Sequence, residues 1–153
     1  MGEKLLKEVI RKELMVIRST SKNKAEVIQE LATLLYENNF VSDVNSFVDD
    51  VYLRETEGIT GIGQGVAIPH GKSIAVKQTA IAIAILEETI TWETLDEKPV
   101  KVVIMFAVKE EDADMTHILL LQRIAILLAH DDFIQNLIQV DNKDNLYDLL
   151  TNS

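Results

Sequence analysis

The stretch T-A-I-A-I-A-I-L, residues 79–86, decides the fold class of this chain. Isoleucine alternates with alanine along it, and alternate side chains of an extended strand point to opposite sides. The pattern predicts a strand with one bulky face and one small face, on which a helix can pack closely. A second stretch, K-V-V-I-M-F-A-V at residues 101–108, is almost continuously apolar, which is typical of a strand buried on both sides. Turn-forming Asp96, Glu97 and Pro99 lie between them, so we expect the two strands to pair as neighbours.

Upstream of these strands the pattern changes from strand to helix. Residues 14–17 form a candidate first strand. Ser19, Thr20 or Ser21 is expected to cap the following helix, whose apolar residues recur at helical spacing up to Leu35. The chain therefore places a helix directly after its first strand.

Further helices are predicted on both sides of the two central strands. Ser42 or Asp43 is expected to cap a helix that ends near Arg54, and helical periodicity returns at residues 115–129. Two more short helices are expected to start at Asp131 and Asn142. We therefore predict a single α/β domain over residues 1–153, with a central mixed β-sheet flanked by helices on both faces.

The composition suits one domain with a sizeable core, because 47% of the 153 residues are hydrophobic. A formal charge of −10, from 15 basic and 25 acidic residues without a basic cluster, argues against a nucleic-acid partner. The absence of cysteine rules out disulfides and thiolate metal sites and favours the cytoplasm. The apolar runs are too short to span a bilayer and the N-terminus lacks a signal peptide's hydrophobic stretch, so we expect no membrane insertion.

The segment R-E-T-E-G-I-T-G-I-G-Q-G-V-A-I-P-H, residues 54–70, carries the strongest functional signal. Its glycines allow unusual backbone angles and close approach of a second protein's main chain. Pro69 biases Ile68 towards an extended conformation, so V-A-I-P is predicted to end a short strand with His70 just beyond it. A neutral imidazole, with a reference pKa of about 6.5, can attack a phosphorus centre through one ring nitrogen.

Two nucleotide-binding motifs resemble this segment and are excluded by one residue. Both a dinucleotide fingerprint starting at Gly61 and a phosphate loop ending in Gly71-Lys72-Ser73 require glycine at position 66, which is Val66. A zinc site built from His70, His117 and a carboxylate is a further alternative, but the tight ligand spacing of such sites is missing.

His117 and Arg54 complete the candidate site. If Asp114 caps the helix, His117 lies in its first turn, where outward-pointing backbone amides favour anions and the imidazole can donate to a phosphoryl oxygen. The guanidinium of Arg54 can hold two phosphoryl oxygens in a forked geometry. Lys72 can neutralise the phosphoryl group, contact a partner or face water. His130 is interpreted as a capping or surface residue outside the site.

Residues 54–72 resemble the reactive-histidine segment of enzyme IIA of the phosphotransferase system, fructose/mannitol class, to which a nitrogen-regulatory branch is related. T-W-E-T-L-D-E-K-P-V-K at 91–101 and H-I-L-L-L-Q-R-I-A-I-L-L at 117–128 extend the resemblance over nearly the whole chain. It implies that the phosphocarrier HPr phosphorylates His70, with His117 and Arg54 holding the group. His70 then passes it to a cysteine of enzyme IIB, and the membrane component, enzyme IIC, acts only indirectly. No metal or cofactor is implied.

Two other functions stay open at this point. A similar domain can act as a regulator that binds partners according to its phosphorylation state, and a non-catalytic interaction module would use its histidines structurally. For a relay, we expect a shallow, moderately apolar and transiently occupied surface around His70. Ile59, Ile62 and Val66 are the candidates for its apolar contacts.

Overall fold

The two central strands predicted from the alternating and apolar stretches are neighbours in the sheet. The computed structural model describes residues 2–112 and 115–152. Strand β5 (Ala80–Ile90) runs antiparallel to β6 (Val100–Lys109), with Ala80 opposite Ala107 and Ile85 opposite Val102. The predicted pairing is confirmed. Strand β6 also pairs with the segment that contains His70.

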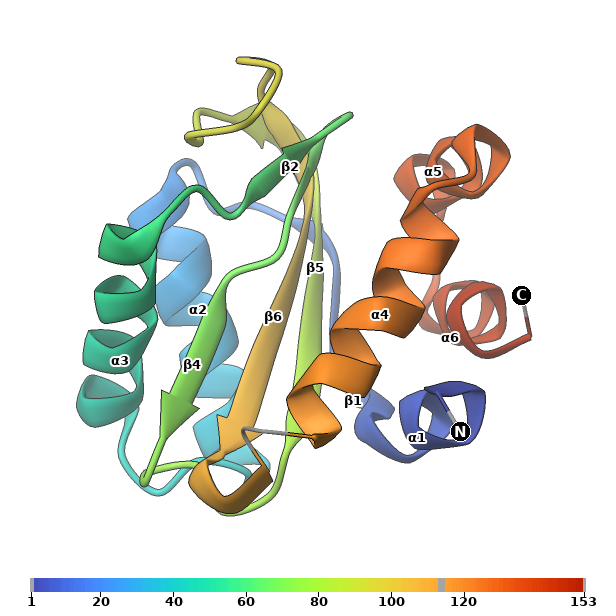
Figure 1. Ribbon diagram of the computed structural model, residues 1–153. Helices are drawn as coiled ribbons and strands as arrows, with labels where there is room; N and C mark the ends of the chain where they lie inside the picture. The colour runs from blue at the N-terminus through green and yellow to red at the C-terminus, as the bar shows by residue number, and fades with distance from the viewer. Residues whose placement is uncertain (1, 113–114, 153) are drawn as a thin grey trace.

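The sheet is mixed, as predicted. In the described part of the chain it has six strands in the order β1-β5-β6-β3-β2, with β4 also paired to β6 (Figure 1). Strand β1 (Ile10–Ser19) lies parallel to β5, while β3 (Val66–Ala67) and β4 (His70–Ser73) both lie parallel to β6. Strand β2 (Gly61–Gly63) forms a short hairpin with β3. The glycine-rich segment is therefore drawn into the sheet.

Helices cover both faces, and the alternation in β5 decides which helices meet which face. The alanines of β5 lie in a core with α2 (Lys24–Glu37) and α3 (Val44–Glu57). Ile81, Ile83 and Ile85 lie in a second core with α1 (Gly2–Val9), α4 (Thr116–Leu128), α5 (Asp131–Gln139) and α6 (Lys143–Thr151). Figure 1 shows the two helix layers on opposite sides of the sheet. The prediction of one bulky and one small face is confirmed, and the chain forms a single domain.

Several helix starts agree with the sequence and one does not. Asp43 caps α3 by accepting from Asn45 N, and Asn142 caps α6 by accepting from Asn145 N. The predicted cap of α2 at Ser19, Thr20 or Ser21 is wrong, because Asn23 accepts the hydrogen bond from Glu26 N at 2.9 Å. The hydroxyls of Ser19 and Ser21 donate instead to the carboxylate of Glu30.

Other differences concern the extent and number of the elements. The first strand covers residues 10–19 and is longer than the predicted 14–17. A 3-10 turn, Glu110–Asp112, precedes α4. Helix α1 was not predicted, and it buries Leu6 and Val9 against the isoleucine face. Among the described helices, none combines the length and the apolar character needed to cross a membrane.

Candidate functional site

His70 opens strand β4 and is held against the middle of the sheet. It lies opposite Phe106 of β6, and the carbonyl of Pro69 accepts a hydrogen bond from Phe106 N at 2.9 Å. The chain does leave strand β3 before His70, as predicted. However, the histidine does not lie in an open loop, because this hydrogen bond brings it directly into the next strand. The backbone of the candidate nucleophile is thus fixed by the sheet.

The His70 imidazole lies between two other rings. It stacks on the Phe106 ring with 5.0 Å between centroids and 20° between planes, and the edge of His117 approaches at 5.0 Å and 63°. Only 5% of His70 is exposed. Within the described residues, His70 Nδ1 and His117 Nε2 are buried without a hydrogen-bond partner. Buried polar atoms without partners are rare in native proteins, and catalytic sites are one place where they occur.

Burial sets the protonation of both histidines. It lowers the pKa of His70 to about 4, with further lowering by the charges of His117 and Arg54, and a contact with the Ile68 backbone acts in the opposite direction. Burial also lowers the pKa of His117, followed by the charges of Lys72 and Arg54. Desolvation disfavours the charged imidazolium, so both rings are neutral at pH 7. His70 therefore has an unprotonated nitrogen that is free to act as a nucleophile.

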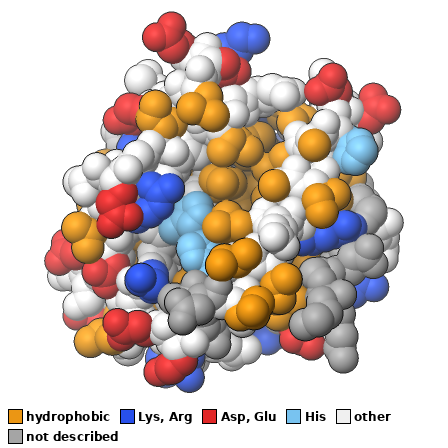
Figure 2. All heavy atoms as spheres, in the orientation of Figure 1, with side chains coloured by type: hydrophobic (Ala, Val, Ile, Leu, Met, Phe, Trp, Pro, Cys, Tyr) orange, Lys and Arg blue, Asp and Glu red, His pale blue; other side chains and the backbone are white. Residues whose placement is uncertain are grey.

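A pocket of about 270 Å³ lies over the two histidines. Helix α3, strand β4 and helix α4 contribute to its lining, which consists of Asp50, Leu53, Arg54, Glu57, His70, Lys72 and His117. Figure 2 shows the histidine atoms at the surface, with Lys and Arg atoms on one side and a band of hydrophobic atoms on the other. The structure thus brings together the three predicted site residues, together with Lys72.

Arg54 and His117 reach this pocket from helix ends. Arg54 lies in the last turn of α3, where its Nη1 donates to the carbonyl of Gly58 at 3.2 Å. His117 is the second residue of α4, so the predicted position in its first turn is confirmed. Met115 occupies the N-cap position without a side-chain hydrogen bond, while the predicted cap Asp114 lies outside the described residues. The first amides of a helix lack partners within the helix itself, and such an end favours anions.

Two glycines of the segment, Gly61 and Gly71, accommodate the chain's own packing, which was not predicted from the sequence. A Cβ at Gly71 would lie 2.3 Å from Cε1 of Phe47, and one at Gly61 would lie 2.3 Å from Cγ2 of Thr94. Gln64 and Gly65, both with positive φ, form the tight turn of the β2–β3 hairpin. The segment is therefore rigidly packed beside His70.

The apolar surface near His70 differs in part from the expected one. Val66 is fully buried under the isoleucine face, so its predicted contact with partners is wrong. Ile59 is exposed, and Ile62 lines an apolar hollow of about 350 Å³. The other lining residues of this hollow are Ile68, Leu121, Ile124, Ala125, Leu128 and Ala129. The α4 residues were missed because the sequence shows helical spacing but not which apolar side chains remain uncovered.

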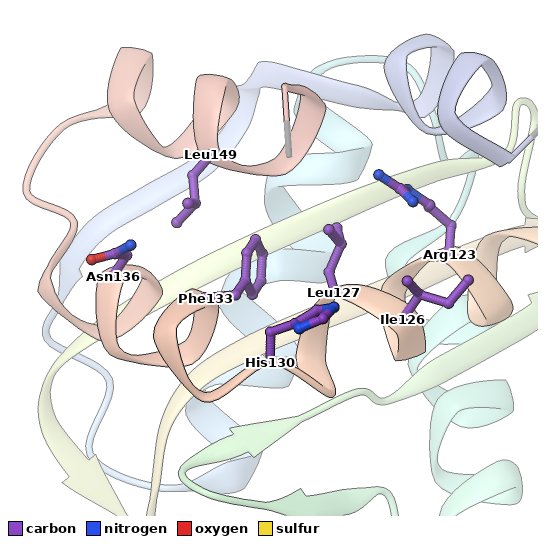
Figure 3. A pocket seen from close by; sticks show the side chains of 7 residues that line it. All are labelled: Arg123, Ile126, Leu127, His130, Phe133, Asn136 and Leu149. Atoms are coloured by element: carbon purple, nitrogen blue, oxygen red, sulfur yellow. The ribbon is translucent and has the colours of Figure 1, made fainter.

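His130 lies away from this site, in agreement with its interpretation as a surface residue. It occupies the N-cap position of α5 and makes no side-chain capping hydrogen bond. It lines a separate groove of about 460 Å³ with Arg123, Phe133 and Asn136, between the C-terminal half of α4, α5 and α6 (Figure 3). Among the described residues there is no group of three or more His, Asp or Glu side chains placed to hold a metal ion.

Comparison with known proteins links this geometry to one family. Residues 8–153 match the family described as "Phosphoenolpyruvate-dependent sugar phosphotransferase system, EIIA 2". The chain is 30% identical over 138 residues to the fructose-specific EIIA component of Haloferax volcanii, covering 90% of this chain and 89% of that protein. It is 32% identical over 143 residues to the fructose-specific EIIABC component of Bacillus subtilis, covering 94% of this chain but 22% of that longer protein.

Solved structures share the fold. The nitrogen regulatory protein IIA-Ntr of Neisseria meningitidis is 28% identical, with a TM-score of 0.87 over 96% of this chain and 99% of that one. The mannitol IIA of Escherichia coli, solved in complex with phosphorylated enzyme IIB, has a TM-score of 0.79 at 19% identity, over 94% of this chain and 98% of that one. At that lower identity the likeness shows the fold alone.

Proposed function

Because the chain belongs to the EIIA 2 family of the phosphoenolpyruvate-dependent sugar phosphotransferase system, we propose that His70 accepts a phosphoryl group and passes it to a partner protein. Members of this family are phosphotransfer components. We further propose that residues 1–153 form one such EIIA domain. The single observation that carries the site assignment is a buried, neutral imidazole with an unpartnered ring nitrogen, which shares one pocket with Arg54 and His117.

The proposed reaction is a direct exchange between nitrogen atoms. The unprotonated ring nitrogen of His70 attacks the phosphorus of a phosphohistidine donor, one N–P bond forms, and the donor's N–P bond breaks. The electron pair of the broken bond returns to the donor imidazole, so no other base is required. In the onward step a thiolate attacks the phosphorus, an S–P bond forms, and the His70 nitrogen recovers its electron pair.

The surrounding charges suit the dianionic phosphoryl group. Phosphoryl transfer needs positioning and charge stabilisation more than covalent help from the protein. In our proposal the Arg54 guanidinium binds two phosphoryl oxygens, His117 donates its N–H, and the amide end of α4 adds partial positive charge. Lys72, exposed on β4 at the pocket rim, adds a further positive charge. Asp50 and Glu57 in the same lining weaken the binding of phosphate and help it to leave.

We propose HPr as the donor and enzyme IIB as the acceptor, with the membrane component enzyme IIC acting downstream in sugar uptake. This relay would operate in the cytoplasm. The fructose-specific names of the Bacillus and Haloferax relatives support a transport role, with a fructose-like sugar as the starting hypothesis. The apolar hollow beside α4 is suited to a small, transient protein contact next to His70.

A regulatory function is the second candidate, and two similarities favour it. The chain is 34% identical over 129 residues to the transcriptional regulator ManR of Bacillus subtilis, of which it covers 19%, and IIA-Ntr of Neisseria has the TM-score of 0.87. Affinity capture with the phosphorylated and unphosphorylated protein separates the two functions. A relay is expected to recover an enzyme IIB, whereas a regulator would bind a transporter, kinase or transcription factor in one state.

The test of the proposed function is intact-mass analysis after incubation with phosphoenolpyruvate, enzyme I and HPr. We expect an acid-labile gain of one phosphoryl group in the wild type, and no gain in His70→Ala. His130→Ala is the matched control and should accept the group like the wild type. Acceptance by His70→Ala would refute the assignment of the site, and no gain in the wild type with active HPr would refute the proposed donor.

A further inference from the structure

We propose that Glu55 is a positioning residue for the phosphoryl site, an inference that rests on the proposed function. Glu55 lies in the last turn of α3, directly after Arg54. Its side chain is 8% exposed, although it carries a carboxylate, and it does not line the pocket over the histidines. A buried charge is costly unless its partners fix it well, so its contacts define where it must sit.

Both carboxylate oxygens of Glu55 have partners from other segments. Oε1 forms an ion pair with Nζ of Lys24, the first residue of α2, at 2.5 Å. Oε2 accepts a hydrogen bond from the Thr60 hydroxyl at 2.7 Å. Glu55 therefore connects the end of α3 to the start of α2 and to the residue just before strand β2.

Trp92 completes the cluster from a distant part of the chain. Its indole N–H donates to the Thr60 hydroxyl at 3.1 Å, and the Lys24 ammonium lies 4.9 Å from the centroid of its ring. Thr60 and Trp92 are both buried. We call Lys24, Glu55, Thr60 and Trp92 the α3-end cluster. The Thr60 hydroxyl donates to the carboxylate and accepts from the indole, so its orientation is fixed on both sides.

Two connections lead from this cluster to the reacting groups. The first is the chain itself, because Glu55 fixes the helical turn that presents Arg54. The second passes through Thr60, whose carbonyl accepts a hydrogen bond from Ile68 N at 2.9 Å, two residues before His70. The cluster thus fixes the guanidinium and the imidazole relative to each other, without touching the phosphoryl group itself.

The burial of this cluster distinguishes it from other ion pairs in the protein. Lys12 and Asp144 form a pair of 2.8 Å, but their side chains are 51% and 78% exposed, and such pairs contribute little. Removing the charge of Glu55 breaks the buried ion pair and leaves Lys24 only its exposed partner Glu93, so we expect the surrounding segments to shift. A displacement of about 1 Å at a transfer site can lower the rate by about 100-fold.

The test is the single-turnover rate of phosphoryl transfer from phosphorylated HPr to His70. Glu55→Gln keeps the side-chain shape and removes the charge, and we expect a rate lower by about 10-fold to 100-fold. Glu93→Gln is the matched control, because Glu93 pairs with the same lysine at 3.1 Å but is 67% exposed. We expect its rate to stay within about twofold of the wild type, as for other exposed pairs.

A double-mutant cycle with Arg54→Gln separates positioning from simple loss of stability. If Glu55 acts mainly through Arg54, Glu55→Gln should slow transfer much less in the Arg54→Gln background than in the wild type. Equal, multiplicative effects in both backgrounds would overturn the action through Arg54, and a wild-type rate for Glu55→Gln would overturn the proposal as a whole. Should Glu55→Gln fail to fold, Thr60→Val is the alternative, because it removes only the hydroxyl between the carboxylate and the indole. We expect it to lower the transfer rate to His70, but by less than Glu55→Gln.

A second readout separates failure of this inference from failure of the proposed function. Heteronuclear NMR of the unphosphorylated protein reports the side-chain resonances of Arg54 and His70 directly. If the wild type accepts no phosphoryl group from HPr, the proposed relay from that donor is wrong, yet Glu55→Gln should still shift both sets of resonances. Unchanged Arg54 and His70 resonances in a folded Glu55→Gln variant would overturn the positioning role whatever the phosphorylation result.

Discussion

Helices α3 and α4 reach the same histidine from opposite faces of the sheet and with opposite ends. Helix α3 approaches with its C-terminal turn, which carries a partial negative charge that would repel a phosphoryl group. Helix α4 approaches with its N-terminal turn, where free amides and a partial positive charge attract one. The first end therefore needs the full charge of Arg54, whereas a neutral His117 is sufficient at the second.

The two ends also differ in how they are held. Helix α3 packs on Gly71 of β4 with no room for a Cβ, and the α3-end cluster fixes its last turn. The start of α4 bears the exposed side chains of Met115 and Ile118, and Met115, its N-cap residue, makes no side-chain capping hydrogen bond. We infer that the end of α3 must be rigid because it binds the phosphoryl group through the side-chain charge of Arg54. The start of α4 can be less rigid because it binds through backbone amides.

The largest effect on the transfer rate is expected from substitution of Arg54 at the end of α3. Arg54→Gln removes the guanidinium and leaves the phosphoryl group facing a helix C-terminus, so single-turnover transfer to His70 should slow by about 100-fold to 1,000-fold, as when a charge-stabilising donor is removed. Arg54→Lys keeps the charge but loses the forked geometry and should recover part of that rate. Wild-type rates in both variants would show that α3 takes no part in transfer.

The pH dependence of stability sharpens the comparison, because Arg54 and His117 both lower the pKa of His70, after burial. The folded state binds the His70 proton with a pKa of about 4, against the ordinary histidine pKa of 6.5 in the unfolded chain. Between these values the unfolded chain takes up a proton that the folded chain does not. Stability is therefore fully present above pH 6.5 and falls with decreasing pH, by at most about 1.4 kcal/mol per pH unit from this group.

Urea unfolding of wild type and His70→Gln at several pH values measures this contribution. The carboxylates titrate alike in both proteins, so the difference between the two curves isolates His70. We expect the difference in unfolding free energy to grow in favour of the variant from pH 6.5 to pH 4 and then to level off. Parallel curves across that window would contradict a neutral, buried His70.

A smaller effect is expected from the packing of α3 on β4. Gly71→Ala places a methyl group against Cε1 of Phe47 and Cγ2 of Val51, so the free energy of unfolding should fall by about 1 to 3 kcal/mol. Phe47→Leu in the same protein makes room and should recover part of this loss. Denaturant unfolding of the two single variants and the double variant checks the coupling, and additive losses would contradict the close approach of helix and strand.

The smallest effect is expected at α4. His117→Ala removes one hydrogen-bond donor while the helix amides remain, so transfer to His70 should slow by about 10-fold, the order of one hydrogen bond to a charged group. His117→Gln retains an N–H and should be less impaired, and His130→Ala should behave as the wild type. If His117→Ala lowered the transfer rate more than Arg54→Gln, α4 and not α3 would contribute more to holding the phosphoryl group.

The sequence predicted the parts of this arrangement that depend on local pattern. Alternation in residues 79–86 identified the two faces of the sheet, and a predicted helix end placed Arg54 beside the glycine segment. The pairing of His117 with His70 was implied by the family resemblance. The cap at Asn23 was missed because three hydroxyl-bearing residues precede it, and the bonds of Ser19 and Ser21 to Glu30 form only in the folded chain. The local sequence does not show whether these hydroxyls bond to a backbone amide at the helix start or to the Glu30 carboxylate.

Contacts between distant segments were beyond a single sequence. Lys24 lies 69 residues from Glu93, and Thr60 lies 32 residues from Trp92, so no spacing rule links them. The glycines at 61 and 71 indicated conformational freedom, but their function is to admit Thr94 and Phe47. Val66 was expected at the surface because β3 could not be recognised as a strand covered on both faces.

The most direct measurement is a long-range proton–nitrogen NMR spectrum of the histidine rings before and after phosphorylation by HPr. The chain has three histidines, so each ring serves as a control for the others. We expect one ring nitrogen of His70 to acquire coupling to phosphorus, the His117 resonances to shift as its N–H binds the phosphoryl oxygens, and His130 to stay unchanged. Phosphorus coupling at His117 or His130, or a His117 ring that does not respond, would contradict a phosphoryl group held on His70 between the two helix ends.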